Sequence, residues 1–465
     1  MFRIFKQYIP SSFFILAAVE FLVLIFAIYA GIALRFLGDP VAVPSGGTIW
    51  PIAVTFALVF FLALAAMGLY QRRFRHGTAG MVLRLAAAIV LGGMAISVLY
   101  YLVPAIFVGR GATAISVLVA FVLLLVIRYI FIRTIDQDTL KRRVLVLGAG
   151  QQAQQISQQL RRRTDRRGFL VVGYVHVRGE HDVVEENLIL RPDVPLLTLV
   201  KRLQVDEIVI AVGDRRRKSF PVHELLDCKL SGVDVIDLLG FYEREVGKIK
   251  LDALNPSWLI FSDGFNQSLW FSIEKRLFDI LVSLLLLFVV WPAMVLTALA
   301  IKLEEGFRGP ILYRQVRVGR HWKLFNVYKF RSMRVDAEKN GAQWAQKNDP
   351  RLTHVGEFIR KVRLDELPQI FNVLKGDMSF VGPRPERPEF VTNLTDQIPY
   401  YAERHRVKPG ITGWAQVCYP YGASEKDSLE KLQYDLYYIK NYTLFLDFVV
   451  ILQTAHEVLW GKSGR

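Results

Sequence analysis

The residue types best suited to chemistry are concentrated in residues 360–386, which read RKVRLDELPQIFNVLKGDMSFVGPRPE. Asp365 and Glu366 are adjacent carboxylates within one helical turn of Arg360 and Arg363. If this stretch is helical, both arginines lie near the side of the helix that carries the carboxylates. A charged surface helix would explain a lone pair of carboxylates equally well, so the residues that follow decide between the two interpretations.

A turn rich in glycine and proline follows the two carboxylates. Gly376, Gly382, Pro383 and Pro385 frame Arg384, and such a rigid turn suits the presentation of a guanidinium group to phosphate oxygens. Phosphoryl transfer needs carboxylates for a divalent metal and arginines for phosphates, because its catalysis is mainly positioning and charge neutralisation. The segment therefore indicates phosphoryl-transfer chemistry.

The composition indicates a membrane protein. Hydrophobic residues make up 52% of the 465 residues, a share too high for an ordinary soluble protein. The formal net charge of +16 would also suit nucleic-acid binding, but basic residues of membrane proteins concentrate in cytoplasmic loops and meet anionic headgroups. We therefore expect contact with membrane lipid and no nucleic acid.

Four apolar segments before residue 135 are long enough to span a membrane, and they are residues 11–34, 49–69, 85–107 and 113–132. The first contains Glu20, which either lines a functional site or pairs within the helix bundle or with a neighbouring chain. Basic residues flank the segments at the N-terminus, between the second and third, and after the fourth. The positive-inside preference then places the N-terminus and everything after residue 135 in the cytoplasm.

From residue 143 onward, short β-branched runs alternate with polar helical stretches, as in a Rossmann-like α/β unit. The first run leads into Gly148 and Gly150, part of a GxGxxA turn that lets the backbone approach a pyrophosphate. The acidic residue expected for a ribose hydroxyl is missing, and His176 stands about where it would fall. We therefore favour a structural or regulatory domain over one that binds NAD or another dinucleotide.

A fifth apolar run covers residues 280–301 and has Pro292 near its middle. A full crossing would export the dense basic stretch that begins at Lys302, against the positive-inside preference. A helix broken at Pro292, which dips into the membrane and returns to the cytoplasmic face, satisfies both constraints. A buried core helix and a fifth span are the alternatives.

Several segments together resemble the bacterial sugar transferases, the monotopic polyprenyl-phosphate phosphoglycosyl transferases. The resemblance covers about residue 272 to the C-terminus. In chain order it rests on KRLFD, which holds Lys275, Arg276 and Asp279, and on GPILYRQVRVGR, YKFRSM, LDELPQ, GDMSFVGPRP and KPGITGWAQV. The four spans and the α/β unit before them are similar to long-form members, which start capsule and exopolysaccharide assembly.

The resemblance implies a covalent mechanism in which Asp365 is the nucleophile. It would attack the sugar-bearing phosphorus of a UDP-sugar, release UMP, and pass the phosphosugar to undecaprenyl phosphate. Glu366 would assist the metal site or the incoming phosphate, with Mg²⁺ or Mn²⁺ held at Asp365 and Glu366. Arg360 and Arg384 are the first candidates for phosphate ligands. Further candidates, for which contact with anionic lipid is the alternative, are Arg314, Lys329 and Arg331.

The expected architecture combines a four-helix transmembrane region, a Rossmann-like α/β domain, a linker, and a mainly α-helical monotopic catalytic domain with a re-entrant helix. These parts cover residues 1–140, 141–240, 241–272 and 273–465. The resemblance implies a multi-pass protein of the bacterial inner membrane, with the catalytic domain on the cytoplasmic face, and a homodimer. Arg276 and Asp279, three residues apart, are expected to pair where the re-entrant helix begins.

Three questions stay open at this point. The family often has a serine before the helix-breaking proline, where this chain has Trp291, so the partners of the freed carbonyls are undetermined. The sequence does not indicate which sugar is transferred, with glucose or galactose as the default, or for which polysaccharide. A membrane-anchored nucleotide-sugar dehydratase or epimerase and a nucleotide-sensing scaffold are the rival functions, although no second dinucleotide fingerprint or YxxxK pair follows residue 240.

Overall fold

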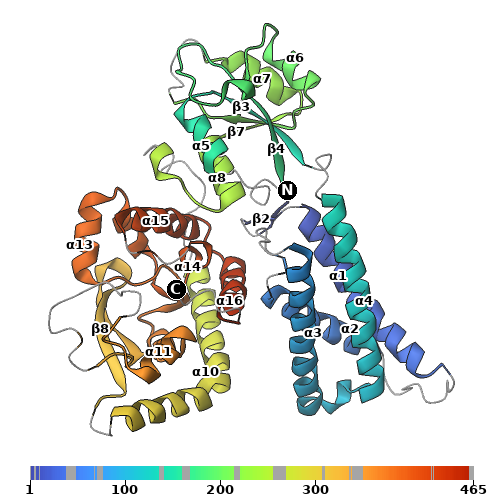
Figure 1. The fold of residues 1–465 in the computed structure, drawn as a ribbon, viewed down its shortest axis with the longest axis vertical. Coiled ribbons are helices and arrows are strands. Elements are labelled where there is room, and N and C mark those ends of the chain that lie inside the picture. Colours follow the sequence, from blue (N-terminus) through green and yellow to red (C-terminus); the bar gives the residue numbers. More distant parts are fainter. Residues whose placement is uncertain are drawn as a thin grey trace. The chain divides into compact units, whose positions relative to one another are not determined.

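The computed structural model of the chain divides into two compact units, one ending at Val246 and the other beginning at Gly247. Figure 1 shows the elements of both units. The structure describes residues 2–4, 7–9, 11–37, 49–67, 69–70, 77–135, 141–159, 168–213, 220–254, 269–305, 309–334, 337, 349–419, 422 and 424–459.

The first unit begins with a short pair of strands and a set of long apolar helices (Figure 1). These elements are β1 (Phe2–Ile4), β2 (Gln7–Ile9), α1 (Ser11–Arg35), α2 (Ile49–Ala66), α3 (Gly77–Leu102), η2 (Pro104–Ile106) and α4 (Arg110–Ile135). Helices α1 to α4 are long and apolar enough to cross a membrane, as is one further helix described below. The prediction of several apolar N-terminal helices is confirmed, and the protein is membrane-associated.

Helices α1 and α4 are held together by close packing and by a buried ion pair. A Cβ on Gly31 would lie 2.0 Å from the Ser116 hydroxyl oxygen, so only glycine permits this approach of the two helices. Glu20 is fully buried, and its Oε2 accepts hydrogen bonds from Arg128 Nη2 at 2.7 Å and from the Tyr70 hydroxyl at 2.5 Å. Of the alternatives for Glu20, the structure shows pairing within the bundle.

Replacing Arg128 by methionine is expected to destabilise the bundle by about 3 kcal/mol, because it leaves the Glu20 carboxylate buried without its cation. The measurement is the free energy of unfolding of the protein in detergent, with Arg110→Met at the exposed end of α4 as the control. The double variant Glu20→Gln, Arg128→Met should recover part of the loss. Equal effects of Arg128→Met and Arg110→Met would contradict this role of the pair.

The rest of the first unit is a five-stranded sheet flanked by helices (Figure 1). The strand order is β5-β4-β3-β6-β7, and every neighbouring pair is parallel. The elements are β3 (Arg142–Leu147), α5 (Gln151–Gln159), β4 (Phe169–Val175), η4 (Glu186–Leu188), β5 (Ile189–Leu190), α6 (Leu196–Arg202), β6 (Glu207–Ile210), α7 (Val222–Leu230), β7 (Asp234–Asp237) and α8 (Leu238–Val246). Buried aliphatic side chains from β3, β6 and α6 form its core. The predicted α/β unit with a parallel sheet is thus confirmed.

The second unit is mainly helical and contains two small sheets. Its elements are η5 (Leu251–Ala253), α10 (Leu269–Glu305), β8 (Leu312–Val318), η6 (Arg320–Trp322), β9 (Leu324–Phe330), α11 (His354–Lys361), η7 (Leu364–Glu366), α12 (Gln369–Lys375), β10 (Ser379–Val381), α13 (Pro388–Gln397), η8 (Tyr401–Arg406), β11 (Gly410–Thr412), α14 (Trp414–Cys418), α15 (Glu425–Lys440) and α16 (Leu444–Leu459). Strands β8 and β9 form an antiparallel hairpin, and β10 pairs with β11 in parallel. Among the described residues of this unit, the largest core cluster joins α13, α15 and α16 to β10.

Helix α10 is the fifth helix that is long and apolar enough to cross a membrane. It contains Pro292 and runs without interruption from Leu269 to Glu305, so the chain bends here where the sequence suggested a break. Figure 1 shows the two halves of α10 running in clearly different directions. Proline causes such a bend because it has no N–H for the helix and its ring clashes with the carbonyl four residues earlier, here that of Phe288.

The charged residues at the start of α10 make contacts other than the predicted pair. Asp279 pairs with Lys275 at 3.0 Å and accepts hydrogen bonds from the Ser379 hydroxyl and the Phe380 backbone, both at 3.0 Å. Arg276 instead donates to the carbonyls at the C-terminal end of α12, those of Val373 and Leu374. The predicted pairing of Arg276 with Asp279 is therefore wrong, because Arg276 donates to carbonyls in the last turn of α12 and Asp279 pairs with Lys275.

Candidate active site

Asp365 and Glu366 lie on η7, a single 3-10 turn between α11 and α12. Helix α11 ends at Lys361, and Arg363 has a left-handed backbone with φ of 61°. The stretch is therefore not the continuous helix that the prediction assumed, although Arg363 still lies near Glu366. A non-glycine residue in this conformation is strained, which is frequent beside functional groups.

Three cations surround Glu366. Lys329 Nζ and Arg384 Nη2 lie 2.9 Å and 3.0 Å from its Oε1, and Arg363 Nη1 lies 3.9 Å from its Oε2. Burial opposes ionisation of Glu366, but the charges of these cations outweigh it and hold its pKa well below the usual range. Glu366 is thus a permanent anion that fixes the positions of Lys329 and Arg384.

Asp365 has the opposite electrostatic environment. Its side chain is buried, and its Oδ1 has no hydrogen-bond partner among the described residues. Burial and the neighbouring Glu366 charge raise the pKa of Asp365 to about 6, against the opposing charges of Lys329, Arg360 and Arg363. The two adjacent carboxylates therefore differ in role, because one is tied to cations and the other presents an unpaired oxygen.

Two further arginines donate hydrogen bonds to the backbone of the turn that carries Arg384. Arg404 is buried, pairs with Asp435 at 3.0 Å, and donates to the Arg384 carbonyl at 2.9 Å. Arg317 donates to the Pro385 carbonyl at 3.1 Å. These contacts fix the turn so that the Arg384 side chain reaches Glu366.

Sequence reasoning assigned no site role to Arg317, Arg404 or Asp435. Arg317 is one of many basic residues in its stretch, and nothing in its local pattern distinguishes it. Arg404 and Asp435 lie 20 and 51 positions after Arg384, so no spacing rule connects them to the turn. Only the packing of η8 and α15 brings them there.

The remaining predicted phosphate ligands lie in different surroundings. The positive charge of Arg360 opposes the upward shift of the Asp365 pKa. Arg314 stacks over the Tyr328 ring, 5.5 Å from its centre, on the β8–β9 hairpin. Arg331 is buried at the end of β9, and a Cβ on Gly309 would lie 2.5 Å from its Nη1. Of the five candidates, Lys329 and Arg384 contact the carboxylate pair directly.

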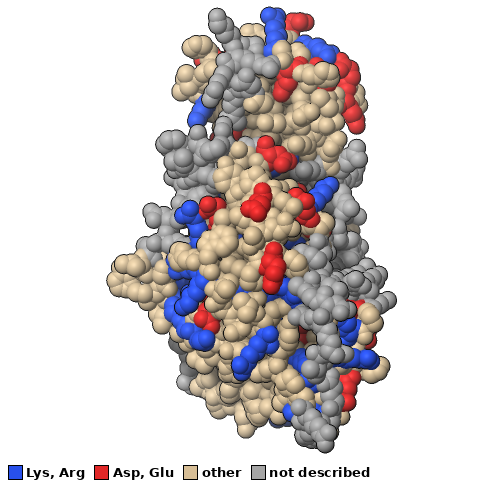
Figure 2. All heavy atoms as spheres, turned by 90° about the vertical axis from the view of Figure 1, so that its left-hand side faces the viewer, with Lys and Arg blue, Asp and Glu red and all other residues tan. Residues whose placement is uncertain are grey.

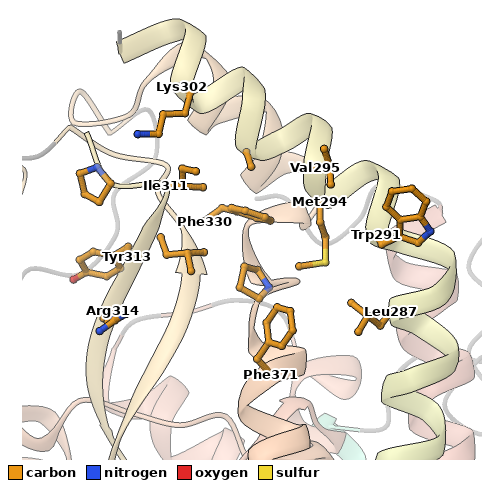
Figure 3. Close-up of a pocket in the computed structure, with 14 residues that line it drawn as sticks. Leu287, Trp291, Met294, Val295, Lys302, Ile311, Tyr313, Arg314, Phe330 and Phe371 are labelled. Atoms are coloured by element: carbon orange, nitrogen blue, oxygen red, sulfur yellow. The ribbon is translucent and has the colours of Figure 1, made fainter. Parts of the chain in front are cut away.

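A large apolar pocket of about 900 Å³ adjoins this site. Figure 3 shows its walls, which are α10 on both sides of the bend, the β8–β9 hairpin, and the beginning of α12. Pro368 and Phe371, three and six positions after Asp365, form part of the lining. The catalytic segment and the pocket wall are therefore continuous in the chain.

The residues present fit a divalent metal only with help from a substrate. Among the described residues, no three His, Cys, Asp or Glu side chains gather in a way that would hold a metal ion. Asp365 offers an unpaired anionic oxygen, whereas Glu366 already faces its three cations. Mg²⁺ commonly takes one or two carboxylates and completes its shell with phosphate oxygens and water, so Asp365 fits a metal that arrives with a diphosphate.

The glycine turn of the α/β unit faces a carboxylate. Gly148 has φ of +111°, a conformation that glycine adopts freely. Glu180 Oε1 lies 2.6 Å from the position that a Cβ on Gly150 would take, and Glu180 Oε2 lies 3.0 Å from the equivalent position at Gly148. The turn in this structure therefore does not fit a pyrophosphate, since two anions would repel each other there.

Two families match the chain. Residues 270–461 match the family described as bacterial sugar transferase. This range includes the entire site described above. Residues 65–219 match a family described as CoA-binding domain. The Glu180 carboxylate at the glycine turn does not fit the phosphates of such a ligand.

Similar proteins of known name are sugar phosphotransferases. A UDP-N-acetylgalactosamine-undecaprenyl-phosphate N-acetylgalactosaminephosphotransferase of Aeromonas hydrophila is 39% identical over 66% of this chain and 70% of its own length. A UDP-glucose:undecaprenyl-phosphate glucose-1-phosphate transferase of Xanthomonas campestris pv. campestris is 35% identical over 70% of this chain and 68% of its own length. A Klebsiella pneumoniae protein of the same name as the latter is 45% identical over 58% of each chain. The chain therefore belongs to the bacterial sugar transferase family and is a transferase enzyme.

Proposed function

We propose that the protein transfers a sugar 1-phosphate from a UDP-sugar to undecaprenyl phosphate and so starts the assembly of a surface polysaccharide. The observation that carries the mechanism is the buried, unpaired Oδ1 of Asp365 beside an ionised Glu366. Family membership contradicts the rival functions of dehydratase, epimerase and non-enzymatic scaffold. The relatives act on N-acetylgalactosamine or glucose derivatives, so both hexoses and N-acetylhexosamines are candidate sugars.

In the first step, an Asp365 oxygen attacks the sugar-bearing phosphorus of the donor. A phosphorus–oxygen bond forms at Asp365, the bond to the bridging oxygen breaks, and UMP leaves with that oxygen. In the second step, an oxygen of the polyprenyl phosphate attacks the same phosphorus and releases the Asp365 carboxylate. The product is a polyprenyl diphosphate sugar, and the enzyme returns to its starting state.

The cations of the site neutralise the phosphates during both steps. Lys329 and Arg384, fixed by Glu366, would bind the donor oxygens, and the positive charge of Arg360 would favour the ionised form of Asp365. A magnesium ion held by Asp365 and the substrate diphosphate would reduce the repulsion between the anionic nucleophile and its anionic target. Figure 2 shows further Lys and Arg side chains on the face of the second unit, interspersed with acidic and uncharged residues.

The decisive experiment traps the covalent adduct. The purified enzyme is mixed with Mg²⁺ and a UDP-sugar alone, quenched, and digested for mass spectrometry. The peptide that contains Asp365 should gain the mass of one sugar phosphate. A preparation that makes lipid-linked product yet never carries this adduct would refute the two-step mechanism.

The pH–rate profile of the first step should show an acidic limb near pH 6, below which the rate constant falls. Asp365 must be ionised to attack, and burial beside Glu366 raises its pKa to about 6. The carboxyl group is therefore protonated below this pH, and the rate constant of UMP release with donor alone should fall about tenfold per pH unit. Rapid-quench kinetics between pH 4.5 and 8 would measure it, with circular dichroism to verify folding. A rate that stays constant down to about pH 4.5 would contradict the raised pKa.

We further propose that α10 is re-entrant, with the catalytic unit on the cytoplasmic face of the bacterial inner membrane. The support is the bend at Pro292, together with basic residues that continue after Lys302. A tag after Arg465 should then be accessible only from the cytoplasm, and periplasmic access would mean that α10 crosses the membrane. The homodimer implied by the resemblance remains a prediction that crosslinking in membranes can examine.

A further inference from the structure

The pocket beside α10, here called the α10 groove, has walls that suit a hydrocarbon chain. Figure 3 shows the side chains of Met294, Phe330 and Phe371 gathered between α10 and the β8–β9 hairpin. Its volume of about 900 Å³ is large enough for a sizeable organic ligand. An apolar pocket of this size next to a phosphoryl-transfer site suits a substrate with an apolar chain.

The open side of the groove is also apolar. Trp291, Val295 and Phe371 line it and are 56%, 57% and 46% exposed. Exposed apolar patches of this kind mark surfaces that meet another apolar phase or partner. With α10 seated in the membrane, as proposed above, the groove opens to the hydrocarbon of the bilayer.

The charged residues of the lining are both cations. They are Lys302, in the last turn of α10, and Arg314 on β8. A ligand with one apolar chain and one anionic head matches this distribution, because the chain is buried against the apolar wall while the head meets the cations. Pro368 and Phe371 connect this wall to η7, so a head at their end of the groove, where Figure 3 also shows Arg314, would lie on the side of Asp365.

We propose that the α10 groove binds the isoprenyl units nearest the phosphate of the polyprenyl phosphate acceptor. This inference rests on the proposed function and locates its second substrate. The acceptor phosphate must reach the phosphorus bound to Asp365, and a chain lying in the groove holds its head at that end. A two-chain phospholipid in the same place would block the acceptor.

The test compares two neighbouring positions on α10. Val295→Trp fills the groove, whereas Leu296→Trp adds the same bulk at a residue that is 66% exposed and does not line it. We expect Val295→Trp to raise the KM for undecaprenyl phosphate about tenfold or more and Leu296→Trp to change it less than about twofold. UMP release with donor alone, measured in each variant, serves as the internal reference, because it does not require the acceptor.

A photocrosslinking arm covers the case in which Val295→Trp folds poorly. Benzoylphenylalanine replaces Val295 or Leu296 in enzyme reconstituted in phosphatidylethanolamine and phosphatidylglycerol vesicles. Labelled undecaprenyl phosphate should be captured at Val295 and not at Leu296, and unlabelled acceptor should compete with the capture.

The possible outcomes separate this inference from the proposed function. Equal KM values in the two tryptophan variants, or capture at Val295 of phospholipid that undecaprenyl phosphate does not displace, would overturn the groove assignment. A wild-type enzyme that releases no UMP from any UDP-sugar and forms no lipid-linked product would instead overturn the proposed function.

Discussion

Replacing Asp365 by asparagine is expected to lower turnover by about three orders of magnitude or more, because the amide cannot form the bond to phosphorus. The same change should leave the protein at least as stable. Burial beside Glu366 raises the pKa of Asp365, so its ionised form is less favourable in the folded state than in the unfolded state. That cost grows as the pH rises from the usual carboxyl range to about 6, and asparagine removes it at neutral pH.

UMP release and the melting temperature together measure this prediction. Asp396→Asn, at an exposed position on α13, is the matched control and should change neither quantity. Asp365→Asn with full UMP release would exclude Asp365 as the nucleophile. A large fall in the melting temperature would show instead that Asp365 has a structural role.

Replacing Glu366 by glutamine is expected to have two effects of different origin. It leaves the half-buried Lys329 and Arg384 without their anion, which should cost about 2 kcal/mol of stability and lower turnover by about two orders of magnitude. It also removes a negative charge next to Asp365 and should lower the pKa of Asp365. The acidic limb of UMP release should therefore shift below pH 6.

The shift of the limb distinguishes an electrostatic role from a merely structural one, because lost packing alone does not move a titration. Glu357→Gln, an exposed residue in the first turn of α11, keeps the same chemical change away from the site and is the control. A limb that remains near pH 6 in Glu366→Gln would contradict the coupling of the two carboxylates. Unchanged stability would contradict the role of Glu366 as the anchor of its cations.

The opposite pKa shifts of Asp365 and Glu366 show how adjacent, chemically similar side chains acquire different functions. Glu366 gains Lys329 and Arg384 as partners, which arrive from β9 and from the turn after β10. Asp365 is equally buried but has an oxygen without a hydrogen-bond partner among the described residues. A site for phosphoryl transfer needs this division, since one carboxylate must order the cations and the other must react.

The sequence by itself determined the apolar helices, the α/β unit and the residues of the catalytic segment. Spans are set by a length of chain and its composition, and a parallel sheet by alternating runs, so both are local properties. The LDELPQ and GPRP stretches likewise carry their chemistry in adjacent residues. Pro292 was enough to predict a change of direction in α10, because a proline disrupts the hydrogen bonding of any helix.

Tertiary structure alone decided which charges meet. The pairing of Arg276 with Asp279 was expected from their spacing. Instead, Asp279 pairs with Lys275 and accepts a hydrogen bond from the backbone at the start of β10, and Arg276 donates to a carbonyl of α12. Arg404 reaches the catalytic turn only because η8 and α15 pack against each other and bring Arg404 and Asp435 beside that turn. The physical reason is that long charged side chains choose partners by distance and burial in three dimensions, and these depend on packing between segments far apart in the chain.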